Sequence, residues 1–189
     1  MKNHMKTLLL ATVLLIAIGL LTSCGAQEKK ENKPPKMEIH AAAFMGKLDE
    51  IKAHIAFGSD LNVKDAYGST ALNIASTFGH TEIAKALIAG GADPNVKNSD
   101  GSTALHSASF FCYKDIVQSL LEGGADPAIR NNFGGTAGES VSAPFSAVKA
   151  IYDQMGRDLG PLGLKMDYEE IQVLRPQIAE MISTYESQD

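Results

Sequence analysis

The sequence predicts an all-α solenoid of about four stacked units, with short β-hairpin or turn fingers between them and a helical C-terminal cap. The main observation is an internal repeat. Residues 65–97 align with residues 98–130 without a gap at an offset of 33 residues, and fifteen of the thirty-three positions are identical. A fixed period of this length indicates one supersecondary unit that buries its apolar face against neighbouring copies. Such arrays generally offer a surface to a partner rather than a pocket for chemistry.

The N-terminal segment 1–23 has the pattern of a secretion signal. Lys2 and Lys6 precede an almost uninterrupted apolar run, 7–21, which is shorter than the roughly 20 residues that cross a bilayer. The run ends in LTSC, with the cysteine at position 24, and this tetrapeptide resembles the lipobox of bacterial lipoproteins. The resemblance implies cleavage before Cys24 and attachment of several acyl chains, which anchor durably at ~0.8 kcal/mol per buried methylene. The alternative is an uncleaved signal anchor in which Cys24 is an ordinary residue.

A lipidated, flexible tether is predicted for residues 24–37. This stretch is rich in charge, contains two adjacent prolines and lacks apolar periodicity, so we expect it to be extended and solvated. By analogy with sorting in enteric bacteria, Gly25 in place of an aspartate after the cysteine favours the outer membrane. We therefore expect a lipid-anchored protein of the bacterial cell envelope, on the outer membrane and facing the periplasm.

The charge balance of the mature chain is acidic. Without Lys2 and Lys6, 15 of the 17 basic residues remain against 22 acidic ones, a net charge of −7. This balance argues against a nucleic-acid partner and against electrostatic attachment to anionic lipid. With Cys24 acylated, Cys112 is the only thiol, which excludes an intrachain disulfide. We expect a monomer that is stabilised by packing and carries no cofactor.

Each repeat is predicted to contain two helices. Thr70 and Thr103 stand at the start of the first helix, where a hydroxyl can accept a hydrogen bond from a free amide. Apolar residues within 83–88 have the i, i+1, i+4, i+5 spacing of a second, amphipathic helix. The glycine pair 90–91 ends that helix, because glycine readily adopts the left-handed conformation. Aspartate or asparagine three residues before glycine then predicts a turn at the finger between units.

These features resemble the ankyrin repeat. The first copy matches the family pattern at Asp65, Gly68, Thr70, Leu72, Ala75, Gly79, His80, Ile83, Leu87, Gly90 or Gly91, Ala92, Asp93 and Asn95. The second copy matches at Gly101, Thr103, Leu105, His106, Ala108, Ile116, Val117, Leu120, Leu121, Gly124, Ala125 and Asp126. The departures are alanine for the family's proline at Ala71 and Ala104, asparagine for its histidine at Asn73, and cysteine for its turn glycine at Cys112.

The array is predicted to extend over residues 38–163. Residues 39–64 align helix for helix as an N-terminal capping repeat, and 131–137 repeats the finger and the start of a helix. After Val141 the pattern degrades, and residues 144–160 form a longer amphipathic pattern that ends in a glycine-rich turn. The remaining residues, 164–189, are predicted to be a helical cap, broken or kinked before Pro176 because proline disfavours helix at the preceding residue.

Few residues suggest chemistry. Ser146 and Lys149 have the S-x-x-K spacing of a serine–lysine nucleophile pair, but the accompanying S-D-N and K-T-G elements are missing. Cys112 is the other candidate nucleophile. His40 and His106 lie two repeats apart, about 20 Å at ~10 Å per helix layer, which is too far to share a metal. The ankyrin resemblance implies instead that both bond to the backbone of the adjoining finger. We expect no catalytic and no metal site.

Aromatic residues mark the predicted partner-binding surface. In ankyrin proteins the finger tips and the ends of the first helices line a concave binding face, and aromatic residues on such a face are typical of interface hot spots. Phe110 is expected to be exposed, because Thr77 holds the same position one repeat earlier. The alternative is that about half of these aromatic residues pack between repeats. The candidate partner-binding residues are Tyr67, Ser69, Phe78, Asp100, Phe110, Phe111, Tyr113 and Phe133.

Together these expectations describe a membrane-tethered scaffold that binds an unidentified protein in the cell envelope. A specific form is an immunity or inhibitor lipoprotein that masks a toxin, or an accessory factor for a periplasmic enzyme. Two other classes stay open: a purely structural spacer, and an enzyme that uses Ser146 with Lys149 or uses Cys112.

Overall fold

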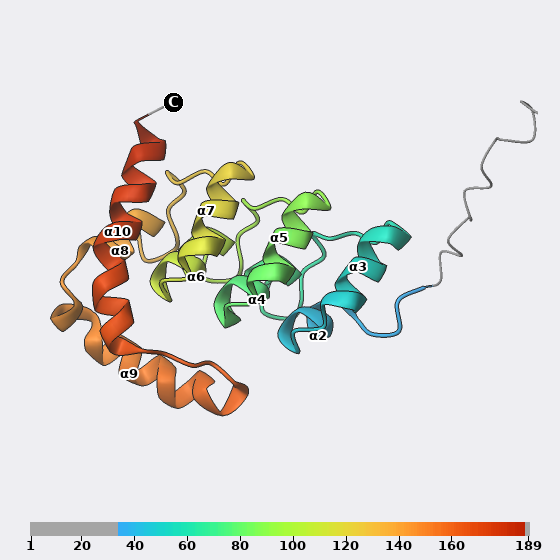
Figure 1. The fold of residues 1–189 in the computed structure, drawn as a ribbon, viewed down its shortest axis with the longest axis horizontal. Coiled ribbons are helices and arrows are strands. Elements are labelled where there is room, and N and C mark those ends of the chain that lie inside the picture. Colours follow the sequence, from blue (N-terminus) through green and yellow to red (C-terminus); the bar gives the residue numbers. More distant parts are fainter. Residues whose placement is uncertain (1–33, 188–189) are drawn as a thin grey trace, which may run out of the picture. The chain divides into compact units, whose positions relative to one another are not determined.

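The computed structural model describes residues 34–187 (Figure 1). Within this range the chain forms nine α-helices and one short 3-10 helix, and no strand. The predicted signal peptide 1–23, the lipidation residue Cys24 and most of the predicted tether 24–37 lie outside the described residues. Among residues 34–187, none of the helices has both the length and the apolar character that a membrane span requires.

Three successive helix pairs repeat one arrangement. They are α2 (Ile39–Phe44) with α3 (Leu48–Phe57), α4 (Ala71–Phe78) with α5 (Thr81–Ala89), and α6 (Ala104–Phe110) with α7 (Lys114–Glu122). Figure 1 shows the first helices of the pairs side by side in one layer and the second helices in another. Each helix packs on its own partner and on the corresponding helix of the next pair. The predicted all-α solenoid is confirmed.

Small residues and helix caps explain why these short helices form and pack. Ala42, Ala75 and Ala108 occupy the same place in successive repeats and are all fully buried, so the first helices can approach closely. The Thr70 hydroxyl oxygen accepts a hydrogen bond from the Asn73 backbone N–H at 3.2 Å, which satisfies a free donor at the start of α4. This bond confirms the predicted role of the threonine at the helix start.

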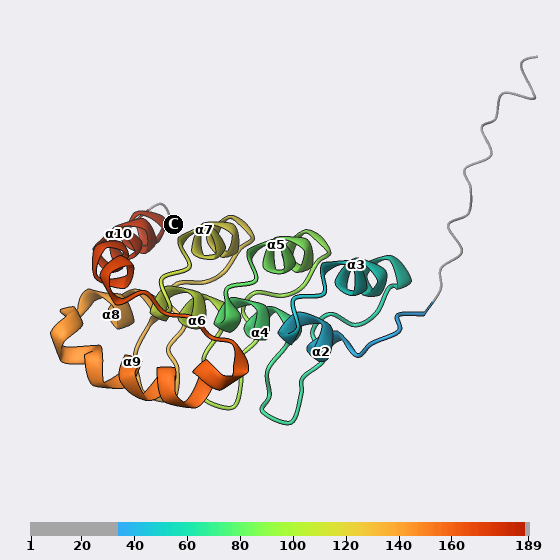
Figure 2. The same cartoon turned by 60° about the horizontal axis from the view of Figure 1, so that its bottom comes forward.

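A fourth pair is interrupted by an inserted helix. The remaining elements are α8 (Ala137–Ser142), α9 (Phe145–Leu159), η1 (Gly160–Leu162) and α10 (Tyr168–Glu186). Helix α8 packs on α6, whereas α10 packs on α7 and α8. Helix α10 therefore takes the place of the second helix of this pair. Helix α9 lies outside both layers (Figure 2).

The C-terminal helix differs from its prediction at Pro176. We expected a break or kink before this residue. The break is wrong, because α10 is a single helix with Pro176 inside it. The residues Ile171, Ile178 and Ile182 form one buried stripe against the array. Pro176 itself is on the exposed side, where water can reach the carbonyl that lacks an N–H partner. Packing of the buried stripe therefore outweighs the local preference of proline.

Candidate functional site

The fingers between helix pairs are tight turns. In the first finger, Oδ1 of Asp65 accepts hydrogen bonds from the backbone N–H groups of Tyr67 and Ser69, both at 2.8 Å. The Ser99 N–H of the second finger donates to the Tyr67 carbonyl oxygen at 3.0 Å, which joins the two fingers. Within the described residues the predicted fingers are thus turns and not β-hairpins.

Three of the predicted partner-binding residues stand at the finger tips. Tyr67 and Phe133 are 78% and 83% exposed, and Asp100 on the finger between them is also exposed. Rings so exposed contribute little to the core. The finger tips therefore present two large apolar side chains to solvent in a repeated geometry.

Helix α9 runs alongside the first helices, on the side of the fingers (Figure 2). Its apolar residues Phe145, Val148 and Tyr152 pack against the core of the array, and Tyr152 has no exposed surface. The Tyr152 ring stacks on Phe110 at the end of α6, with ring centroids 4.5 Å apart and an angle of 16° between the planes. The C-terminal half of the groove is consequently filled by the chain itself.

This packing corrects the expectation for Phe110, which is half-buried under α9 rather than exposed. Its neighbour Phe111 is only 8% exposed and meets the Phe110 ring edge-on at 5.1 Å. Tyr113 is half-buried, and burial followed by the nearby Cys112 raises the pKa of its hydroxyl to about 12. All three rings pack within the protein, as the alternative interpretation of the aromatic residues proposed.

The N-terminal half of the groove stays open, with a volume of about 590 Å³. Three predicted residues line it: Tyr67 from the tip of the first finger, and Ser69 and Phe78, which are both half-buried. The Phe78 ring meets Phe44 of α2 edge-on, with centroids 4.9 Å apart and planes at 88°. Leu159 and Leu162, from the end of α9 and from η1, also line it. The open groove is therefore a composite of the repeats and the inserted helix.

Sequence reasoning missed several residues of this groove. Phe44 occupies the same repeat position as Phe110, so the repeat alignment contained the signal that could have found it. Ile74, one helical turn away from Phe78, also lines the groove. Leu162 carried no such signal, because no repeat pattern relates η1 to the first finger.

A buried arginine holds α9 in place. Arg175 of α10 is 2% exposed, and its Nη1 donates to the Tyr152 hydroxyl oxygen at 2.8 Å. Its Nη2 donates to the carbonyl oxygens of Ser140 and Ala143, each at 2.8 Å. The Tyr152 hydroxyl in turn donates to the Phe110 carbonyl oxygen. One network therefore ties α9 to α6, to α10 and to the end of α8.

The candidate nucleophiles lie in settings that do not favour catalysis. Lys149 Nζ bonds to both carboxylate oxygens of Asp153 at 2.9 Å, while Ser146 is exposed on the same helix. Cys112 is 4% exposed, and burial raises the pKa of its thiol to about 11. Its backbone φ of 61° reproduces the left-handed turn for which Gly79 serves one repeat earlier. Among residues 34–187, no three acidic, histidine or cysteine side chains are grouped to hold a metal ion.

His40 and His106 form a histidine column, because they occupy the same position two repeats apart. They have the structural role that the ankyrin resemblance implies. His40 Nε2 lies 2.9 Å from the Val63 carbonyl oxygen, and His106 Nε2 lies 3.2 Å from that of Gly135. Nδ1 of His106 accepts from the Thr103 backbone N–H at 3.2 Å. Burial is the main cause that lowers the pKa of His106. The neutral ring therefore links the start of α6 to the next finger.

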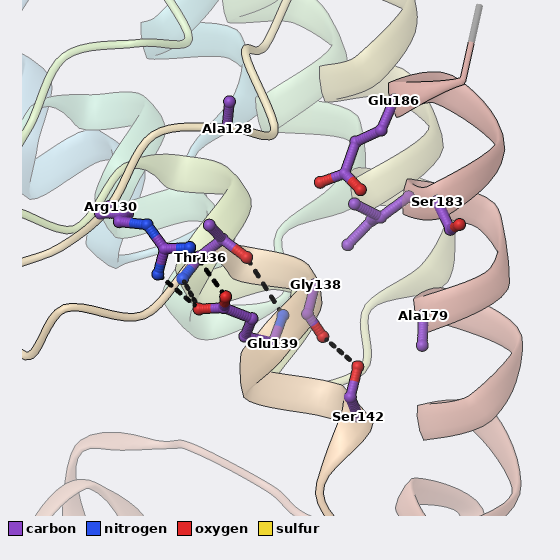
Figure 3. Close-up of a pocket in the computed structure, with 10 residues that line it drawn as sticks. Ala128, Arg130, Thr136, Gly138, Glu139, Ser142, Ala179, Ser183 and Glu186 are labelled. Atoms are coloured by element: carbon purple, nitrogen blue, oxygen red, sulfur yellow. Dashed lines mark hydrogen bonds and ion pairs between the residues drawn. The ribbon is translucent and has the colours of Figure 1, made fainter.

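A second depression lies at the C-terminal end of the array, beside α8 and α10 (Figure 3). Lys64 and Lys97 each donate to the backbone carbonyl one repeat onward, at 2.8 and 3.1 Å. Arg130 has the corresponding position in the last finger and forms instead a two-bonded ion pair with Glu139, at 2.8 and 2.9 Å. The repeated lysine-to-carbonyl bond therefore ends at this depression, where Arg130 and Glu139 pair with each other.

The comparison with known families agrees with this architecture. Residues 39–131 match the family model described as ankyrin repeats (3 copies). The chain is an ankyrin-repeat protein, as its sequence motifs predicted. Such repeats indicate a scaffold for protein–protein interaction. Among curated proteins, none matches the chain. The matched range ends before α8, so the fourth helix pair and the inserted α9 are known from the structure alone.

Proposed function

We propose that this protein is a membrane-tethered scaffold that binds a protein partner in the bacterial cell envelope. The observation that carries the proposal is the exposure of Tyr67 and Phe133 at the finger tips, at 78% and 83%. Exposed aromatic side chains gathered on one surface are typical of binding hot spots. The lipobox-like segment before Cys24 supports the tether, and the acidic balance supports a partner other than nucleic acid.

Affinity capture tests the scaffold. The full-length chain is used as bait in its own envelope extract, beside the double variant Tyr67→Ala/Phe133→Ala. We expect the double variant to lose the partner while its thermal midpoint stays near that of the wild type, because neither ring is part of the core. Phe57→Ala is the matched control, since Phe57 is 45% exposed at the end of α3 and away from the fingers. Equal capture by the wild type and the double variant would refute the proposed surface.

Membrane fractionation tests the tether. Cys24→Ala removes the acylation site, so we expect the chain to leave the outer-membrane fraction. Continued retention in the membrane would contradict lipid anchoring at this residue. An immunity or accessory role is a special case of the same function, and a toxin or a periplasmic enzyme among the captured proteins would identify it.

A further inference from the structure

The open half of the groove contains one fixed negative charge among mostly apolar side chains. Among residues 34–187, Asp65 is the only acidic residue that lines it, and no lysine or arginine of this range does. Phe44, Tyr67 and Ile74 supply apolar surface from the repeats, and Leu159 and Leu162 supply it from the inserted segment. An apolar site with a single carboxylate suits a side chain that is apolar and has a cation next to it.

The charge of Asp65 is not needed to form the finger. In the next two fingers the same position holds Asn98 and Asn131, and their Oδ1 atoms accept the same pair of backbone hydrogen bonds, at 3.0 and 2.9 Å and at 3.0 and 3.2 Å. An asparagine therefore shapes this turn as well as an aspartate does. The negative charge is therefore not required by the turn. Of the two fingers that line the open groove, through Asp65 and Asn98, only the first has a charged residue at this position.

Helix α9, whose last residue Leu159 lines the groove, is anchored to the array. Tyr152, in the middle of α9, is fully buried and accepts a hydrogen bond from Arg175 of α10. This contact fixes the central turn of α9 as well as its ends. Leu162 is 54% exposed where this segment meets the groove. A partner therefore meets a groove that is already half filled by α9 and continuous with the face on which α9 packs.

We propose that the open groove binds a protein segment in which a leucine or aromatic side chain lies beside a lysine or arginine. The apolar side chain enters between Phe44, Tyr67 and Leu162, and the cation pairs with the carboxylate of Asp65. This assignment rests on the proposed scaffold function and names the chemistry of its partner. Opposite charges across an interface give specificity and faster encounter, and the pairing weakens as salt rises.

A library of phage-displayed twelve-residue peptides, selected on the full-length chain in a lipid nanodisc, is the probe. We expect the enriched peptides to combine a leucine or aromatic residue with lysine or arginine within one helical turn. Binding of an enriched peptide should fall about tenfold with Asp65→Asn, the order expected from loss of one favourable charge pair. Its salt dependence should fall with the same variant. Leu162→Asp should abolish binding.

Matched controls separate the site from general effects. Asp126→Asn removes an exposed charge whose Oδ1 also accepts a turn hydrogen bond, at 2.8 Å. Val173→Asp places a charge on α10 at a side chain that is 61% exposed and outside the groove. Both controls should bind the peptide as the wild type does. Enriched peptides without the basic residue, or peptides that bind Asp65→Asn and Leu162→Asp normally, would overturn the proposal.

Capture of the natural partner by these variants distinguishes a failure of the groove proposal from a failure of the scaffold function on which it rests. If Asp65→Asn and Leu162→Asp keep the captured envelope protein while Tyr67→Ala/Phe133→Ala loses it, the scaffold function stands and the composite groove is wrong. If the wild type binds neither a peptide nor an envelope protein, both are wrong. Loss of the partner by Asp65→Asn and Leu162→Asp, with retention by Asp126→Asn and Val173→Asp, supports both.

Discussion

Replacing Tyr152 with phenylalanine tests whether α9 is a fixed part of the groove. The variant keeps the ring and its stacking on Phe110 but removes one hydroxyl. The Phe110 carbonyl then keeps only the weak Cys112 thiol donor at 3.8 Å, and Arg175 Nη1 loses an acceptor at 2.8 Å in a side chain that is only 2% exposed. A buried polar group left without a partner costs about 1–3 kcal/mol, and more when it is charged. We therefore expect Tyr152→Phe to lower the free energy of unfolding by about 2–3 kcal/mol.

Thermal unfolding followed by circular dichroism measures this effect. At about 2–4 °C per kcal/mol for a chain of this size, the midpoint should fall by about 5–10 °C. Hydrogen exchange should also be faster in α9 than in α5, because the lost hydroxyl joins α9 to its neighbours. Tyr67→Phe is the control, since Tyr67 is 78% exposed and its hydroxyl should matter little. If the two variants unfold at the same temperature, the network around Arg175 does not hold α9.

Three further predictions concern the repeats. Burial lowers the pKa of His106, so the stability that its neutral ring contributes is complete above pH ~6.5 and is lost as the pH falls through the folded-state pKa. His106→Asn, the residue found at Asn73, should reduce this loss in urea unfolding compared at pH 7.5 and pH 5. Because burial raises the Cys112 pKa to about 11, a thiol reagent at pH 8 should label the folded chain far more slowly than the urea-unfolded chain. Gly79→Ala should lower the free energy of unfolding in urea by at least about 1 kcal/mol, because φ is +71° there and a Cβ would lie 2.7 Å from the Tyr113 ring. Unchanged unfolding would show that neither the positive φ nor the ring opposes a side chain at this position.

Much of the repeat architecture could be predicted because it depends on local spacing. Thr70 at the start of a helix, the buried alanines at 33-residue intervals and the histidine column all reappear in the structure where the repeat alignment put them. The exposure of Tyr67 and Phe133 follows from the same pattern, since a finger tip has no neighbour to cover it. These features need contacts only within one unit or with the next.

The failures involve contacts between distant parts of the chain. Phe110 was expected to be exposed, because nothing near it in the sequence covers it. Its cover is Tyr152, which lies 42 residues further along the chain. Pro176 was expected to interrupt its helix, but the buried stripe of α10 packs on the array and keeps the helix continuous. In both cases a long-range contact outweighs the local signal.

The sequence by itself determined the helix pairs, their period and their order, because apolar spacing and turn residues specify each unit and similar units stack on one another. It also showed that residues 144–160 form an amphipathic helix. Only the tertiary structure decided where that helix packs. An apolar stripe predicts that a helix packs against another surface, but it does not identify that surface. By lying in the groove, α9 buries Phe110 and leaves a smaller site between Asp65 and Leu162. The shape of the open groove is therefore a property of the fold as a whole.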